Sequence, residues 1–155
     1  MLHLARRSRE ALQLMQQLIK LEAPTANTHS RLGFIYTANG RYEEAVAEHQ
    51  QAISLFGETT GGLSYLGCAL AAAGKRAEAH AILNKLETTK DYVSPEELAG
   101  LYAMLGDREG AFAQLEKAYV AHDLQLQVLK IDLHLDSLRS DPRFEDLVRR
   151  VGLPE

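Results

Sequence analysis

The residues that could do chemistry in this chain are its histidines, a single cysteine and a few aspartates near the C-terminus. A helical zinc site needs two histidines four residues apart, often as His-Glu-x-x-His, and neither pattern occurs here. The six histidines are spread over the whole chain: His3, His29, His49, His80, His122 and His134. Their spacing predicts packing or solvent contacts and no metal site.

The acidic residues and the cysteine also lack the neighbours that chemistry would require. Asp132, Asp136 and Asp141 are without the glycine and terminal glutamate of a calcium loop, which predicts a solvated acidic face. Cys68 has no basic residue after it until Lys75, so it is expected to pack as a small hydrophobe. No phosphate-binding loop or nucleophile elbow occurs either. The sequence therefore predicts a protein that is not an enzyme and needs no cofactor.

An internal repeat indicates the elements that position these side chains. A leucine and a small residue, then a glycine and an alanine at fixed offsets, occur three times. The copies are Leu32-Gly33, Gly40 and Ala45; Leu66-Gly67, Gly74 and Ala79; and Leu98-Ala99, Gly106 and Ala111. The offset is 34 residues between the first two copies and 32 before the third. Such a period predicts a solenoid of helical hairpins, with each glycine in the turn between paired helices.

The repeat resembles the tetratricopeptide repeat, whose pattern has Leu-Gly, an aromatic three residues on, Gly, then Ala, an aromatic and Ala. The first copy fits this pattern best, through Tyr36, Gly40, Tyr42, Ala45 and Ala52. The resemblance implies an all-α fold: a right-handed superhelix of antiparallel helix pairs that ends in a C-terminal capping helix.

The period also divides the chain, which is expected to form a single domain over residues 1–155. The expected parts are a partial repeat with only a second helix at 1–22, repeats at 26–59, 60–91 and 92–123, and a C-terminal cap at 124–155. A longer parent protein is the preferred explanation of the partial repeat, and a solitary cap is the alternative. After Ala121 the pattern stops, and the tail is apolar but irregular until Asp141-Pro142 begin a final helix.

Local signals describe the third repeat. Ser94 can cap a helix that has Pro95 at its first position, and Glu97 can reach back to complete a capping box. Gly100 and Gly110 lie inside the expected helices, where each costs about 1 kcal/mol relative to alanine. We expect this repeat to be the least stable one.

Tetratricopeptide arrays bind partners in a concave groove lined by the first helices, and the resemblance implies such a groove here. Its predicted lining is Asn27, Arg31, Phe34, Tyr65, Cys68, Glu97 and Met104. Only Asn27 and Arg31 resemble the Lys, Asn and Arg clamp that holds an acidic chaperone tail, so a full clamp is not expected. Aromatic and methionine side chains suit an extended apolar peptide or an amphipathic helix. Filling of the groove by the tail or by a second chain is left open.

Net charge and the length of the apolar segments limit the classes of partner that we expect. The formal net charge of -4 disfavours nucleic acid, and no apolar segment is long enough to insert into a membrane. The expected function is a non-catalytic protein-protein interaction module for a peptide or partner protein, with a homodimer left open. A cytoplasmic location is expected, or a periplasmic one if a parent chain has an upstream membrane span.

A second resemblance supplies the alternative function. Residues 91–154, with Ser-Pro-Glu-Glu-Leu-Ala, Leu-Glu-Lys-Ala-Tyr and Leu-Arg-Ser-Asp-Pro-Arg-Phe, resemble the C-terminal tetratricopeptide segment of bacterial signalling proteins. Those proteins include winged-helix activators, adenylate cyclases and Ser/Thr kinases. The resemblance implies a ligand-sensing or dimerising regulatory segment of a larger bacterial signalling protein.

Overall fold

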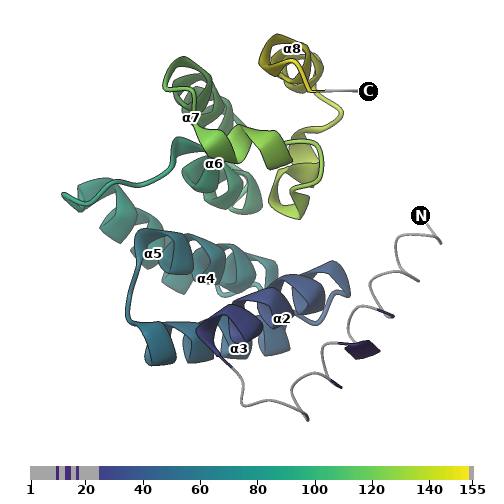
Figure 1. Cartoon of the computed structure of the whole chain (residues 1–155). Helices are drawn as coiled ribbons and strands as arrows, with labels where there is room; N and C mark the ends of the chain where they lie inside the picture. The colour runs from purple at the N-terminus through teal and green to yellow at the C-terminus, as the bar shows by residue number, and fades with distance from the viewer. Residues whose placement is uncertain (1–9, 11–12, 15–16, 18–24, 154–155) are drawn as a thin grey trace.

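The computed structural model describes residues 10, 13, 14, 17 and 25–153, and all regular structure in this part of the chain is helical. Three antiparallel helix pairs are followed by two 3₁₀ helices and a last α-helix (Figure 1). The pairs are α2 (Ala26–Ala38) with α3 (Tyr42–Phe56), α4 (Thr60–Ala72) with α5 (Arg76–Thr88), and α6 (Pro95–Met104) with α7 (Arg108–Val120). The tail forms η1 (Leu124–Val128), η2 (Leu133–Leu138) and α8 (Pro142–Val151). The predicted all-α fold of paired helices is confirmed.

The second helix that the sequence predicts within residues 1–22 lies outside the described residues, apart from 10, 13, 14 and 17. Among the described helices, none is both long enough and apolar enough to cross a membrane.

Three glycines form the turns inside the helix pairs. Gly40, Gly74 and Gly106 have φ angles of 71°, 79° and 83°, which would strain any residue with a side chain. In each turn the N–H of the next residue donates to the carbonyl five residues before it, at 2.9 Å. This is the Schellman arrangement that ends a helix. The predicted position of all three glycines is confirmed.

Other glycines allow helices to approach closely. A Cβ at Gly33 would lie 2.5 Å from the ring of His49, and one at Gly67 would lie 3.0 Å from Leu101. A Cβ at Gly110 would lie 2.6 Å from Tyr102, the residue opposite it in the third pair. The glycine inside α7 is therefore explained by packing, which offsets its cost in helix propensity.

The hydrophobic core has two parts. One joins the three helix pairs and includes Leu32, Leu63 and Leu83. The other joins α6 and α7 to the tail and α8, and it contains fully buried leucines such as Leu115 and Leu135. The tail is thus an integral layer of the fold and not an appendage to it.

The tail follows a nine-residue pattern, which corrects the expectation that it is irregular. Asp123, Asp132 and Asp141 each accept a hydrogen bond from the N–H two residues on, at 2.9, 2.9 and 3.0 Å, and so cap η1, η2 and α8. Residues three and six positions after each aspartate are between 0 and 5% exposed: Leu126 and Leu129, Leu135 and Leu138, and Phe144 and Leu147. Each unit is a capped helical turn that buries two large side chains.

The same aspartates correct the prediction of a solvated acidic face. Asp132 and Asp141 are half-buried caps with partners inside the fold. Asp136 is the exposed member, and it pairs at 2.6 Å with Arg139, the residue that follows η2. The spacing of Asp132 and Asp141 therefore serves helix capping.

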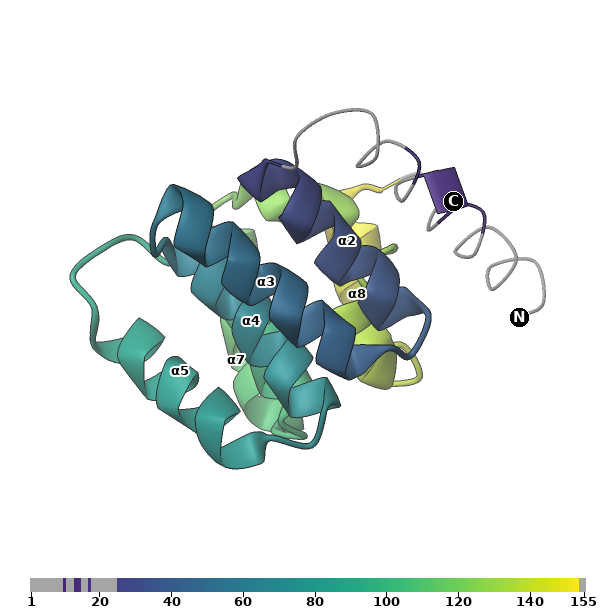
Figure 2. The ribbon, with the colours of Figure 1, turned by 90° about the horizontal axis from the view of Figure 1, so that it is seen from below.

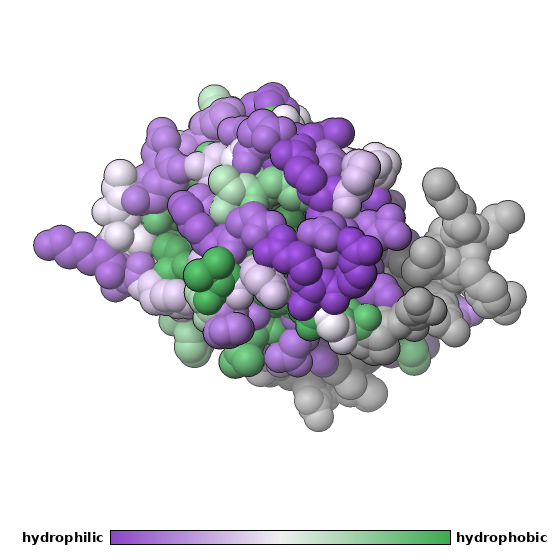
Figure 3. Space-filling model, turned by 90° about the horizontal axis from the view of Figure 1, so that it is seen from above, coloured by the Kyte–Doolittle hydropathy of each residue, from purple (hydrophilic) through white to green (hydrophobic). Residues whose placement is uncertain are grey.

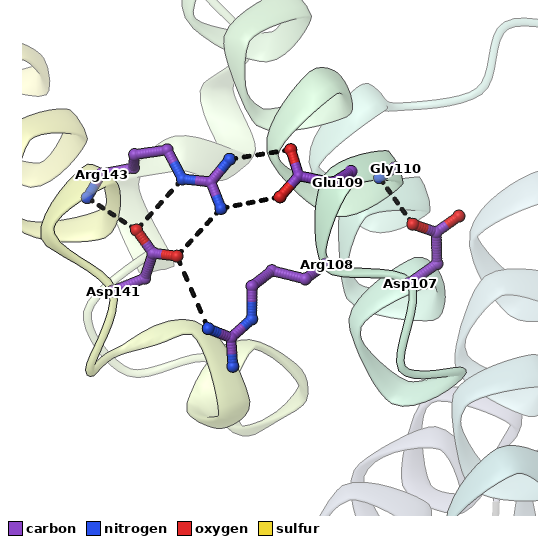
Figure 4. A network of polar contacts seen from close by, with 6 residues as sticks. All are labelled: Asp107, Arg108, Glu109, Gly110, Asp141 and Arg143. Atoms are coloured by element: carbon purple, nitrogen blue, oxygen red, sulfur yellow. Dashed lines mark hydrogen bonds and ion pairs between the residues drawn. The ribbon is translucent and has the colours of Figure 1, made fainter.

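Arg143 fastens α8 to α7 (Figure 4). Its two terminal nitrogens donate to the two carboxylate oxygens of Glu109, both at 3.0 Å, and its guanidinium carbon lies 4.0 Å from the ring centre of Phe112. The same guanidinium donates to Asp141 at 2.9 Å, and Arg108 approaches that aspartate at 3.6 Å. An aromatic ring and carboxylates thus hold the arginine from several sides.

Arg150, two turns further along α8, repeats this arrangement. It donates to both carboxylate oxygens of Glu116 at 2.7 and 2.8 Å, and its guanidinium carbon lies 4.2 Å from the ring centre of Tyr119. Figure 3, a view from above, shows a largely hydrophilic surface with separate hydrophobic spots at this end of the molecule. A polar outer face is what a solenoid requires of its last element, so α8 is the predicted cap.

Candidate interaction surface

The first helices of the three pairs form a continuous row, because α2 contacts α4 and α4 contacts α6. Figures 1 and 2 both place α5 on one side of the stack and α8 on the opposite side. The tail segment η2 packs against α6. The inner face of the row is therefore shared between the first helices and the chain's own tail.

Aromatic rings from four elements meet on this face. The ring centres of Phe34 and Tyr65, both predicted to line the groove, lie 4.6 Å apart with an interplanar angle of 69°. His134 of η2 lies 5.9 Å from Phe34 and 6.2 Å from Tyr65, and His49 of α3 lies 5.7 Å from Phe34. The structure thus brings the two predicted aromatics together and adds two histidines that favour edge and offset contacts with them.

The tail covers the third repeat's part of the groove. His134 is 4% exposed, and its Cβ lies 3.2 Å from the position that a Cβ of Gly100 would take. Gly100 is thus required for the close approach of η2 to α6. The sequence left open whether the tail or a second chain fills the groove. At this position, the tail does.

Cys68 and Met104 do not lie on an open groove surface. Cys68 is 2% exposed, and burial raises the pKa of its thiol well above the usual value, so it packs as the small hydrophobe that the sequence predicted. Met104 is half-buried and packs against the first core cluster. Cys68 is therefore not accessible to a partner, and Met104 is accessible only in part.

Asn27 and Arg31 are exposed on α2. Asn27 lines a pocket of about 230 Å³ between α2, the end of α3 and the start of α4, together with Ser30 and Ile53. The exposed part of the predicted lining is thus concentrated on the first repeat.

Glu97 is half-buried and bonded within the fold. Ser94 caps α6 by accepting from the Glu97 N–H at 3.4 Å, and Pro95 occupies the first turn, so both of these predictions are confirmed. The carboxyl group of Glu97, however, hydrogen-bonds to Tyr65 of α4 and does not complete a capping box. Burial, followed by the charge of Asp123, raises the pKa of Glu97.

Two ionisable groups that the sequence did not single out form a buried chain with His134. The Glu96 side chain, 3% exposed, hydrogen-bonds to Asp132, whose Oδ1 lies 2.9 Å from both the backbone N and the Nδ1 of His134. Burial, then the charge of Asp132, raises the pKa of Glu96 to about 9, so its protonated carboxyl donates to Asp132. Burial alone would raise the pKa of Asp132, but the hydrogen bonds and charge of His134 outweigh it and hold that pKa below its usual value.

This arrangement gives a prediction for pH dependence. The folded state keeps a proton on Glu96 that the unfolded state releases above its usual pKa of 4.5, so the stability it contributes is present below that pH and is lost as the pH rises toward about 9. Glu96→Gln keeps a donor to Asp132 but does not titrate. We expect the variant to gain stability relative to the wild type as the pH rises through this range.

Urea midpoints measured by circular dichroism across this pH range test the prediction. Asp91→Asn is the matched control, because it removes an exposed carboxylate from the loop before α6. A constant difference between Glu96→Gln and the wild type at every pH would contradict the assignment.

Within the described residues, no three His, Cys, Asp or Glu side chains are placed so as to hold a metal ion. Residues 25–61 match the family profile of the tetratricopeptide repeat, a segment that covers α2, α3 and the first residues of α4. Neither the curated proteins nor the solved structures gave a match to the chain.

Proposed function

We propose that this chain, which contains a tetratricopeptide repeat at residues 25–61, is a non-catalytic protein-protein interaction module. It binds a peptide or a segment of a partner protein on the inner face of α2 and α4. Within the groove, η2 already covers α6, so the inner face that the partner contacts is that of α2 and α4.

The observation that carries the proposal is the combination of exposed and half-buried side chains on these two helices. Arg31 and Asn27 are exposed on α2, beside the half-buried rings of Phe34 and Tyr65. Protein interfaces favour aromatic side chains at their anchoring positions and polar side chains at the rim around them. The exposed surface of α2 and α4 has this composition. The family match includes Phe34, and its repeat type is one that serves in protein binding.

A charge reversal tests this proposal without disturbing the core. We expect Arg31→Glu to reduce capture of the wild type's partners by about fivefold or more, because rim charges govern partner choice at such surfaces. Lys117→Glu is the matched control, since it makes the same reversal at an exposed position of α7. The measurement is affinity capture from a lysate with quantitative mass spectrometry.

Equal capture by wild type, Arg31→Glu and Lys117→Glu would contradict the proposed surface.

The role as a ligand-sensing or dimerising segment of a larger signalling protein rests on the resemblance of residues 91–154 and stays a prediction. The homodimer and the compartment stay predictions as well.

A further inference from the structure

A second pocket, of about 400 Å³, opens at the N-terminal ends of α4 and α6. Its walls come from three separate parts of the chain: Thr60 and Gly61, the segment before and within the first turn of α6, and residues 121–125 between α7 and η1. The carboxyl groups of Glu97 and Asp123 belong to two of these walls. The residues that line the pocket include no lysine or arginine.

Asp123 and an aromatic ring lie together in this pocket. Asp123 Oδ2 accepts from Ser94 Oγ at 2.6 Å and lies 3.5 Å from the hydroxyl of Tyr92. Tyr92 and Leu124 are 72 and 77% exposed, so an aromatic and an aliphatic side chain border the carboxylate on the solvent side. The pocket therefore combines a fixed negative charge with accessible apolar surface.

No lysine or arginine of the lining balances the negative charge of the pocket, and His122 is the one basic side chain that lines it. The charge of Asp123, after burial, contributes to the raised pKa of Glu97, which shows that the two carboxyl groups repel each other. Two carboxyl groups thus lie close together in the pocket, and no lysine or arginine of its lining neutralises them.

An anion is the alternative ligand, because the exposed amides at a helix N-terminus attract negative charge. Here Thr59 accepts from the N–H of Gly62 at 3.1 Å, and Ser94 caps α6 in the same way. With one amide of each helix capped and two carboxyl groups beside them, the pocket favours a cation.

The chain itself shows what cation such a combination holds. Arg143 lies over the ring of Phe112 while it bonds to Glu109, and Arg150 lies over Tyr119 while it bonds to Glu116. The pocket offers the same two components, an aromatic ring and a carboxylate, without an arginine of its own.

We propose that this pocket receives an arginine side chain of the partner peptide. The guanidinium stacks on Tyr92 and donates to Asp123 and Glu97, a set of contacts that suits its planar fork of donors better than the point charge of lysine. The proposal rests on the proposed function, because it identifies a side chain of the peptide that the module binds.

The test is an NMR titration of the ¹⁵N-labelled chain with the capped tripeptide acetyl-Ala-Arg-Ala-amide. The same tripeptide with citrulline, which is uncharged and nearly the same shape, is the matched ligand. We expect saturable shifts at the amides of Gly61, residues 92–97 and residues 121–125 with the arginine peptide and none with the citrulline peptide. Glu97→Gln and Tyr92→Ala are each expected to weaken binding by about fivefold, whereas Asp91→Asn leaves it unchanged.

Absence of saturable shifts, equal shifts with the citrulline peptide, or equal weakening by Asp91→Asn would overturn the proposal. The side chain of Tyr92 is largely exposed, so Tyr92→Ala removes the ring without removing a core contact. This variant therefore tests the pocket separately from Glu97→Gln. The Arg31→Glu capture experiment is independent of this pocket. A loss of partners there together with no binding of the arginine peptide here would contradict the pocket alone.

Discussion

Replacing Leu135 with alanine is expected to lower the free energy of unfolding by about 2–5 kcal/mol. Leu135 is 0% exposed and belongs to the second core cluster, which joins α6 and α7 to the tail and α8. The substitution leaves a cavity that these elements can close only in part, because η2 is held in place by the cap at Asp132. The measurement is urea unfolding followed by far-UV circular dichroism.

Leu133→Ala is the matched control, since Leu133 lies in the same 3₁₀ helix, loses the same atoms and is 42% exposed. Its effect is expected to be well below that of Leu135→Ala, because much of its side chain is already in water. Equal losses for the two variants would show that the tail does not pack as the structure places it. The comparison therefore tests whether the tail is part of the cooperative fold.

The second large effect concerns the contact between Gly33 and His49. A Cβ at Gly33 would lie 2.5 Å from the imidazole, which is 3% exposed and is bordered by the rings of Phe34 and Tyr65. We expect the overpacking in Gly33→Ala to cost about 1–3 kcal/mol, offset in part by about 1 kcal/mol of helix propensity.

A double-mutant cycle isolates this contact. In a His49→Ala background the steric conflict is absent, so Gly33→Ala is expected to be neutral or stabilising there. The free energies of unfolding come from urea titrations of the wild type, both single variants and the double variant. If Gly33→Ala has the same effect with and without His49, the two residues are not coupled and the predicted steric conflict does not exist.

The burial of His49 and its lowered pKa explain why this histidine acts as a packing residue. Burial, and then the charge of His134, lowers the pKa of His49 to about 4, so the ring is neutral at physiological pH. The sequence predicts packing or solvent contacts for the histidines, His49 included. Its burial between α2 and α4 confirms the packing role.

Much of the fold could be predicted because helix hairpins are encoded by local signals. The turn at Gly74 and the cap at Ser94 were both readable, since each depends on the conformation or side chain of one residue at a fixed offset. Such features require no knowledge of which elements pack together.

The tail shows where local signals were overlooked. Asp123, Asp132 and Asp141 recur every nine residues, each followed by two buried side chains, but the pattern is neither 34 residues long nor a continuous helical period. The repeat period therefore predicts an irregular apolar segment and a solvated acidic face, and the structure corrects both. A search for capping residues at equal spacing would have found it.

The candidate site was only partly predictable. The repeat period placed Phe34 and Tyr65 on one face of adjacent helices, and their rings do meet. It could not show that His134, more than sixty residues beyond Tyr65, stacks against them, because that contact depends on how the tail folds back. The packing of Cys68 as a small hydrophobe was predictable, but its position beside Gly100, under η2 and away from an open groove, depends on the same fold of the tail.

The sequence by itself determined the hairpins, since glycine turns, small residues at close approaches and helix caps act over a few residues of chain. Only the tertiary structure decided which part of the inner face stays open, because η2 packs against α6. It also decided that Glu96 is protonated and that Asp123 shares a pocket with Tyr92. Burial and the approach of like charges set these properties, and both arise only when segments distant in the chain are brought together.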